Sequence, residues 1–375
     1  MKFRKLFDNE HAVSPIVATL VLIVVAIVGA AAVGTIMGSF SSDVSSSASS
    51  EDAAAGASTR ILVGGSTSVA PLAESLKSGF EKSHPGTQIA VQTGGDSAGV
   101  AAVGMNVLDI GLISRELTHA EKEKYPDLQT HWIGGSAVVM IAGEKITTFD
   151  PGNVGQNTTQ LTPSQIKAIY NSVSSTTAGE VTNIGSARLN ISGTITTTAL
   201  PSGTVITAYK RTETRSGPEY IFSKFIADGN GDFIASKNAV AVTGDAGMLE
   251  AIANDPYGIG FVDYRYALEG KKSGKIHILA IKDDVGGSCN MKQHCVDDIP
   301  HMQKHVKAAL NGNAGAYPAG LLNDMYMVTN GWPSSAEARF INFAQQPSSM
   351  ELYSNAGYYS LLEINKVNVD DPHYH

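Results

Sequence analysis

The fold is decided by one stretch, Ile61-Leu-Val-Gly-Gly-Ser-Thr-Ser-Val-Ala-Pro-Leu72. Its first residues, 61–64, are mostly apolar, which predicts a buried strand. A second glycine and three hydroxyl residues follow, and Pro71 opens an amphipathic segment that reaches Ser83. Because proline is favoured in the first turn of a helix, this segment is predicted to be helical. The stretch therefore predicts a strand that leads into a helix through a loop of glycine and hydroxyl side chains.

The same alternation continues along the chain. Strands are predicted at 88–93 and 108–113, and a helix is predicted between them at 99–106. This β-α-β-α-β order is typical of a largely parallel sheet with helices on both faces, so the body is predicted to be an α/β protein. Further apolar patterns predict later strands at 137–142 and 259–262 and later helices at 163–171, 335–343 and 348–355.

Four loops of one kind lie where a predicted strand ends or a helix begins. They are rich in glycine and hydroxyl side chains and comprise residues 64–71, 94–100, 113–117 and 211–219. In open parallel sheets ligands bind at the carboxyl edge of the strands, where helix N-termini offer unpaired N–H groups. Hydroxyl groups can donate to an oxyanion, and an arginine can bridge two of its oxygens. The loops therefore predict a binding site for a small oxyanion.

Composition and charge restrict the function further. The chain has 375 residues, of which 43% are hydrophobic and 17% charged, which is typical of a packed protein with more than one compact domain. The formal net charge is −8 and no basic stripe is present, which argues against a nucleic-acid partner. Walker, H-E-x-x-H and dinucleotide-binding motifs are missing from the sequence, so no cofactor and no catalytic metal are predicted.

The N-terminal segment predicts a membrane anchor. Residues 12–37 carry no charged side chain, and this run is longer than the about 20 residues that cross a bilayer as a helix. The basic residues within 1–11 are expected to stay on the cytoplasmic side. Residues 1–38 are therefore predicted to be a basic leader and one transmembrane helix, and the Ser/Ala-rich residues 39–59 a flexible linker. This arrangement places the body on the extracytoplasmic side of the cell membrane.

The start of this segment resembles that of archaeal type-IV-pilin-like precursors, through Glu10-His-Ala-Val-Ser-Pro15 and the apolar run behind it. The resemblance implies cleavage near His11 and retention of the apolar helix on the mature chain. It also implies that the helix can drive self-assembly into a surface filament. An ordinary signal anchor without pilin processing is the alternative.

The two cysteines, Cys289 and Cys295, are six positions apart. Outside the membrane a local disulfide is favoured. Free thiols are one alternative. A metal site with His294, His301 and His305 is another, although the spacing fits no standard zinc pattern.

Longer segments resemble the phosphate-binding proteins of ABC transporters, which belong to the two-lobed periplasmic-binding-protein class. The run 65–72 is similar to the first phosphate loop of that family, and Asp109-Ile-Gly-Leu-Ile-Ser-Arg-Glu-Leu117 is similar to its third. The resemblance covers about 60–362. Its other segments, in chain order, are 161–170, 181–184, 258–262, 317–318, 325–333 and 338–343.

The resemblance implies a type II fold of two α/β lobes joined by two crossings, behind the transmembrane helix. The first lobe is expected to comprise 60–136 and 263–375, and the second 137–262. Phosphate would bind in the cleft between the lobes and be delivered to a membrane permease. The chain is accordingly expected to be a binding protein and not an enzyme.

The resemblance also implies which residues bind phosphate. Thr67, Ser68 and Ser114 are expected to contact it from one lobe, and Arg211 and the Ser-Gly pair 216–217 from the other. The sequence departs from the family at 211–218, where one residue is added and a proline replaces a threonine, so Arg215 is an alternative cation. The full predicted set is Ser66, Thr67, Ser68, Asp96, Ser97, Ser114, Arg115, Arg211, Arg215, Ser216 and Gly217.

Asp96 stands where the family usually has a serine. A carboxylate can accept a hydrogen bond from a protonated phosphate and repel a fully ionised sulfate, so Asp96 is expected to select protonated oxyanions. The alternative is that Asp96 caps the helix that follows it.

The segment Gly95-Asp-Ser97-Ala-Gly99 also matches the G-x-S-x-G motif of serine hydrolases. Too little folded sequence precedes Ser97 for the strands of a hydrolase sheet, and no downstream histidine stands in a recognisable context. Binding is therefore favoured over hydrolysis.

Overall fold

The structure is a computed structural model that describes residues 59–146, 160–171, 176–177, 205–213, 216–226, 239–283, 286–289 and 299–364. The chain divides into the units Met1–Ala57 and Ser58–His375, and every described residue belongs to the second. The expected leader, transmembrane helix and pilin-like start lie outside the described residues, as do Arg215, His294 and Cys295. Of the helices in the described ranges, none has the length and apolar character needed to span a membrane.

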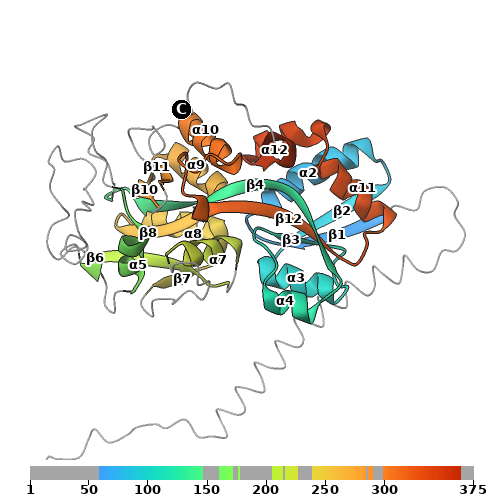
Figure 1. Ribbon diagram of the computed structural model, residues 1–375, viewed down its shortest axis with the longest axis horizontal. Coiled ribbons are helices and arrows are strands. Elements are labelled where there is room, and N and C mark those ends of the chain that lie inside the picture. Colours follow the sequence, from blue (N-terminus) through green and yellow to red (C-terminus); the bar gives the residue numbers. More distant parts are fainter. Residues whose placement is uncertain are drawn as a thin grey trace, which may run out of the picture. The chain divides into compact units, whose positions relative to one another are not determined.

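The first elements follow the alternation predicted from the sequence. They are β1 (Thr59–Gly65), α2 (Ala70–Ser83), β2 (Thr87–Thr93), α3 (Asp96–Gly104), β3 (Ile110–Ile113) and α4 (His119–Lys124). Strand β1 lies between β2 and β3 and is parallel to both. Helix α2 lies on one side of these strands, and α3 and α4 lie on the other (Figure 1). The predicted strands and helices up to residue 113 are therefore confirmed, with shifts of a few residues at their ends.

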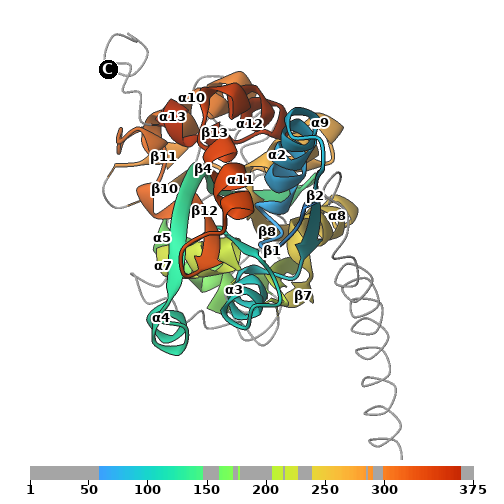
Figure 2. The same cartoon turned by 90° about the vertical axis from the view of Figure 1, so that its right-hand side faces the viewer.

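The long strand β4 (Leu128–Gly143) connects the two parts of the sheet. Its first part pairs with β12 (Leu322–Asn330) and its second part with β8 (Gly258–Asp263), in both cases antiparallel. The strand predicted at 137–142 is thus the second part of a longer one. Since β12 is also antiparallel to β3, the prediction of a largely parallel sheet is wrong for its centre. The reason is that β4 and β12 run side by side and antiparallel in the middle of the sheet, as its two crossings (Figure 1 and Figure 2).

The elements after β4 complete the same sheet and cover it. Their order along the described path of the sheet is β2-β1-β3-β12-β4-β8-β6-β5, and β7 and β8 are parallel to β6. The strands not yet given are β5 (Thr176–Thr177), β6 (Val205–Arg211), β7 (Val240–Val242), β9 (Ile276–Ile278), β10 (Ile281–Lys282), β11 (Ser288–Cys289) and β13 (Tyr359–Ser360). The helices are α5 (Pro163–Asn171), α7 (Gly217–Ile226), α8 (Gly244–Asn254), α9 (Tyr264–Ser273), α10 (Ile299–Leu310), η1 (Ala319–Leu321), α11 (Ser335–Ala344), η2 (Pro347–Ser349), α12 (Met350–Ala356) and α13 (Leu361–Ile364).

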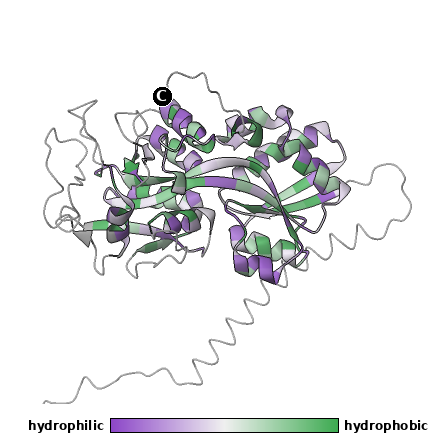
Figure 3. Cartoon of the chain, viewed as in Figure 1, coloured by the Kyte–Doolittle hydropathy of each residue, from purple (hydrophilic) through white to green (hydrophobic). Residues whose placement is uncertain are grey.

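Two large hydrophobic cores divide the described body into two lobes, and a third, small one includes Val100 and Val328. The β1 lobe surrounds a core that includes Val63 and Phe80, with α2, α11 and α12 packed around it. The β8 lobe surrounds a core that includes Ile141 and Phe261, and α5, α7, α8, α9 and α10 contribute to it. Apolar residues follow the strands and α3 in Figure 3, whereas the charged helix α4 is hydrophilic. Helices α9 and α10, which the sequence analysis placed in the first lobe, thus pack in the core of the second.

Helix α3 approaches β1 closely because glycines meet at their contact. A Cβ atom on Gly99 would lie 2.6 Å from the Cα of Gly65, so no larger residue fits at position 99. The carbonyl of Gly65 accepts hydrogen bonds from the backbone N–H groups of Gly94 and Gly95, at 3.0 and 2.9 Å. The loop before α3 is thereby fixed at the carboxyl end of β1, where the sequence predicts the binding site.

Candidate functional site

The serines of the first and third predicted loops meet in the β1 lobe. Oγ of Ser66 lies 3.0 Å from Oγ of Ser114, and the Ser66 backbone N–H donates to the carbonyl of Leu112. Ser66, Ser68 and Ser114 are all 0% exposed. Because β1 and β3 are parallel neighbours, the loops at their carboxyl ends lie side by side. This contact brings the first and third predicted loops together.

Asp96 joins the two lobes through its buried carboxylate. Oδ1 accepts hydrogen bonds from the backbone N–H of Ser114 and, at 3.1 Å, from its hydroxyl group. Oδ2 accepts from the N–H of Gly217, at 2.8 Å, which opens α7 in the β8 lobe. The N-cap of α3 is Gly95, which makes no side-chain capping bond. Asp96 therefore binds the start of a helix in the opposite lobe.

Burial raises the pKa of the Asp96 carboxyl, and this effect outweighs the nearby charge of Arg115 and the hydrogen bonds from Ser114 and Gly217, which lower the pKa. The carboxyl is therefore easier to protonate than one in water.

Gly217 is a point of close approach between the lobes. A Cβ atom at this position would overlap Oγ of Ser114, so any residue larger than glycine would push the lobes apart. The neighbouring Ser216 is 2% exposed, and its Oγ has no hydrogen-bond partner among the described residues. A buried donor without a partner is rare in folded proteins and marks a place where an acceptor can bind.

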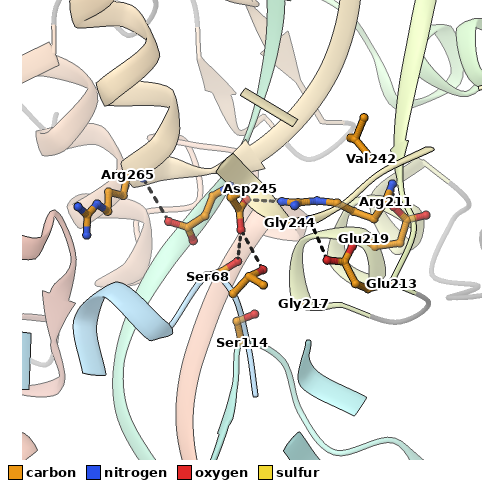
Figure 4. A network of polar contacts seen from close by, with 12 residues as sticks. Ser68, Ser114, Arg211, Glu213, Gly217, Glu219, Val242, Gly244, Asp245 and Arg265 are labelled. Atoms are coloured by element: carbon orange, nitrogen blue, oxygen red, sulfur yellow. Dashed lines mark hydrogen bonds and ion pairs between the residues drawn. The ribbon is translucent and has the colours of Figure 1, made fainter. Parts of the chain in front are cut away.

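Arg211 brings a positive charge to the same place from the carboxyl end of β6. Its side chain is 1% exposed, and Nη2 forms an ion pair with Oδ1 of Asp245. Nε and Nη1 are buried and have no hydrogen-bond partner within the described ranges. Figure 4 shows Arg211 and Asp245 pointing toward each other, with Ser68 and Ser114 below them. Two donor nitrogens of Arg211 are thus available to an acceptor.

Asp245 was not predicted from the sequence. Its side chain is 0% exposed and accepts four hydrogen bonds, from Arg211, from the backbone N–H of Asp263 at 2.7 Å, from the Ser68 hydroxyl at 2.7 Å and from the Thr67 hydroxyl at 3.4 Å. The signal that would have found it is the loop Thr243-Gly-Asp245, which leads from β7 into α8. This loop is of the same strand-to-helix kind as the four predicted ones.

Arg115 and Ser97 bind each other, and Arg115 also binds Glu121. The guanidinium of Arg115 binds both carboxylate oxygens of Glu121 at 2.8 Å, and it donates to Oγ of Ser97 at 3.0 Å. Glu121 also forms a capping box with Thr118 at the start of α4. The charge of Arg115 is therefore matched within the β1 lobe. The hydroxyl of Ser97 accepts from this arginine. A serine nucleophile would instead donate its proton to a base such as histidine.

Two further carboxylates surround Arg211. Oε2 of Glu219 accepts from the backbone N–H of Arg211 at 3.3 Å, and Oε1 of Glu213 accepts from that of Gly244 at 2.8 Å. Burial raises the pKa of Glu219 to about 7, against the lowering effect of Arg211. Burial and the nearby charge of Asp245 raise the pKa of Asp263 to about 8. The sequence patterns do not indicate that Glu213, Glu219 and Asp263 belong to the site.

The structure thus brings most of the predicted residues together and separates a few. A hollow of about 390 Å³ in the β1 lobe, with Tyr125 and Tyr326 in its wall, is lined by none of the predicted residues. Those that meet between the lobes are Ser66, Thr67, Ser68, Asp96, Ser114, Arg211, Ser216 and Gly217.

Two α/β lobes joined by two crossing strands, with polar loops meeting between them, define a two-lobed binding-protein fold. Residues 50–347 match the family model described as PBP superfamily domain, and the chain belongs to this family. It is a class of binding proteins and not of enzymes.

Solved structures and curated relatives agree with this assignment. A protein from Clostridium perfringens, classed as a phosphate ABC transporter substrate-binding protein and solved with bound phosphate, has a TM-score of 0.57 at 19% identity, over 81% of this chain and 100% of that one. An ABC-type phosphate transport receptor from Vibrio cholerae has a TM-score of 0.53 at 19% identity, over 80% and 100%. At these identities the likeness concerns the fold.

A curated relative, Phosphate-binding protein PstS 2 from Streptococcus pneumoniae serotype 4, is 44% identical over 64 residues, which are 17% of this chain and 22% of the relative. The chain therefore matches about a fifth of the length of this relative.

The raised pKa of Glu219 predicts a dependence of stability on pH. The native state keeps this proton up to about pH 7, whereas the unfolded chain loses it near the ordinary value of 4.5. The free energy of unfolding should therefore fall as the pH rises from 4.5 to 7, and Glu219→Gln should reduce that fall and stabilise the protein at pH 8 by about 1–3 kcal/mol.

Urea unfolding between pH 4.5 and 8 measures this effect. The exposed change Glu250→Gln on α8 is the control and should leave the slope unchanged. A Glu219→Gln slope equal to that of the wild type would show that Glu219 is ionised in the native state.

Proposed function

We propose that this chain is an extracytoplasmic solute-binding protein that captures phosphate, or a closely similar tetrahedral oxyanion, between its two lobes. One observation carries the proposal. Buried hydroxyl and backbone donors from the β1 lobe meet a buried arginine and the start of a helix from the β8 lobe, as Ser68, Ser114, Gly217 and Arg211 show in Figure 4.

The chemistry of these donors suits a desolvated anion. A buried oxyanion is held best by several oriented N–H and O–H donors with one bidentate arginine. Serine hydroxyls and the N–H of Gly217 are of this kind, and Nε and Nη1 of Arg211 and Oγ of Ser216 are buried donors that have no partner in the described ranges. A tetrahedral ion offers four oxygens, so it can engage donors of both lobes at once.

Asp96 favours phosphate over sulfate as the ligand of the site. Its carboxylate lies among donors that an anion needs, which repels a fully ionised ligand, whereas a protonated phosphate can donate its own hydrogen bond to the carboxylate. The solved relative from Clostridium perfringens holds phosphate, and its fold is the same. These two observations support phosphate as the ligand.

The cellular role rests on the relatives and on the N-terminal sequence. Relatives of the same fold are classed with ABC-type phosphate transport, which supports delivery of the ligand to a membrane permease. The apolar residues 12–37 support a single-pass anchor that keeps the body outside the cell membrane. Their pilin-like start favours, as a second candidate, a surface filament subunit that displays the same binding domain.

Calorimetric titration of the full-length chain with phosphate, sulfate, molybdate and tungstate tests the proposal. Phosphate should bind most tightly. Gly217→Ala should weaken phosphate binding by on the order of a hundredfold, because the added methyl overlaps Ser114 and removes donors worth about 2–3 kcal/mol from the closed site.

The matched control is Gly247→Ala on α8, where a Cβ atom meets nothing within 4 Å. This variant should bind phosphate as the wild type does. Absence of binding by all four anions, or equal loss of affinity in both glycine variants, would contradict the proposal.

Asp96→Asn tests the selection between anions separately. The amide cannot repel a fully ionised anion, so the preference for phosphate over sulfate should fall by about tenfold. This ratio of dissociation constants corresponds to the free energy of one charge-assisted hydrogen bond. The measurement is the ratio of the two dissociation constants in each protein. An unchanged ratio would show that Asp96 only joins the lobes.

A further inference from the structure

The donors expected to bind the ligand are already bound to carboxylates of the chain itself. Asp245 accepts the hydroxyls of Thr67 and Ser68 and the Nη2 of Arg211. Asp96 accepts the donors of Ser114 and Gly217. The two carboxylates thus bind the donors that the proposed function assigns to an oxyanion.

Asp245 already uses every acceptor site of its carboxylate. A carboxylate has about four acceptor sites, and those of Asp245 receive four donors, two on each oxygen. Asp245 therefore has no site left to accept a proton from a ligand. In its present position it competes with an anion for the hydroxyls of Thr67 and Ser68 and for Nη2 of Arg211.

The charges lead to the same conclusion. The side chains of Arg211 and Asp245 are 1% and 0% exposed, so each neutralises the other away from water. An anion added beside Asp245 would place a second negative charge against one guanidinium, with Glu213 close behind. Tight binding of an anion to Arg211 therefore requires Asp245 to move away.

Asp245 also holds the lobes together. It starts from α8 in the β8 lobe, and its Oδ2 accepts from the loop after β1 in the β1 lobe. The helix start lies beside this loop, since a Cβ atom on Gly244 would be in ordinary contact with Thr67 Cγ2 at 3.7 Å, and the φ of +68° at this position favours glycine. Ser68 is fixed in turn, since its carbonyl accepts from the hydroxyl of Tyr358 at 2.6 Å.

We propose that Asp245 is an internal competitor of the ligand, which occupies the anion site and latches the lobes closed when no ligand is bound. This inference rests on the proposed function. Ligand binding is then an exchange, in which the oxyanion takes Arg211, Ser68 and Thr67 from the carboxylate. The apparent dissociation constant equals the intrinsic one divided by the fraction of molecules in which Asp245 has released these donors. Asp245 thus sets the affinity of the site.

The substitution Asp245→Asn tests the competitor role in the full-length chain. The amide keeps the size of the side chain and loses its charge, so phosphate should bind about tenfold more tightly, the factor that one hydrogen bond to a charged group carries. Glu250→Gln, exposed on the same helix, removes the same charge and should leave the affinity unchanged. If Asp245 instead orients Arg211 for the ligand, Asp245→Asn weakens phosphate binding, and the proposal is wrong.

Amide hydrogen exchange gives a second measurement that needs no ligand. Without phosphate, the N–H of Gly217, which bonds across the lobes, should exchange faster in Asp245→Asn than in the wild type, and phosphate should slow it again. Equal exchange in the two ligand-free proteins would contradict the latch. Asp245→Ser, measured in the same way, replaces the asparagine variant if that one does not fold.

The two proposals can fail separately. If the wild type and the variants bind none of the four oxyanions, the proposed function fails, and the exchange of Gly217 alone decides whether Asp245 is a latch. If the wild type binds phosphate and Asp245→Asn binds it more weakly or equally, only the competitor role fails.

Discussion

The positive charge of Arg211 is the constraint on which the rest of the site depends. A guanidinium that is 1% exposed must be matched by a negative group, because an unpaired buried charge costs several kcal/mol. In this chain the matching group is Asp245, and the side-chain nitrogens Nε and Nη1 of Arg211 have no partner among the described residues. Whichever anion binds here, Asp245 or an oxyanion, also binds the loop after β1. One buried charge therefore couples the chemistry of the site to the closure of the lobes.

The fold brings these groups together by two devices. Parallel strands place successive loops at one edge, which puts Ser66 beside Ser114 in one lobe and Arg211 beside the start of α8 in the other. The antiparallel strands β4 and β12 then cross between the lobes and hold the two edges face to face. Glycine at position 217 allows the final approach, since any side chain there would meet Ser114.

Much of this could be predicted from the sequence, and what could not has a physical reason. The apolar patterns predict β1 to β3 and α5 well, and the glycine-hydroxyl loops predict the residues that meet. The pairing of β4 with β12 joins segments almost 200 residues apart, so local patterns do not contain it. Arg115 was assigned to the ligand because it lies in the third loop, yet Glu121 takes its charge. Asp245 was missed because an isolated aspartate at a helix start is usually a cap.

Crystal structures of the full-length chain grown with and without phosphate would show directly which anion Arg211 binds. We expect a tetrahedral ion within hydrogen-bonding distance of Arg211, Ser68, Ser114 and Gly217, with the carboxylate of Asp245 turned away from the guanidinium only in the phosphate crystal. An ion bound elsewhere, or an Arg211–Asp245 pair left intact with phosphate bound, would contradict this expectation.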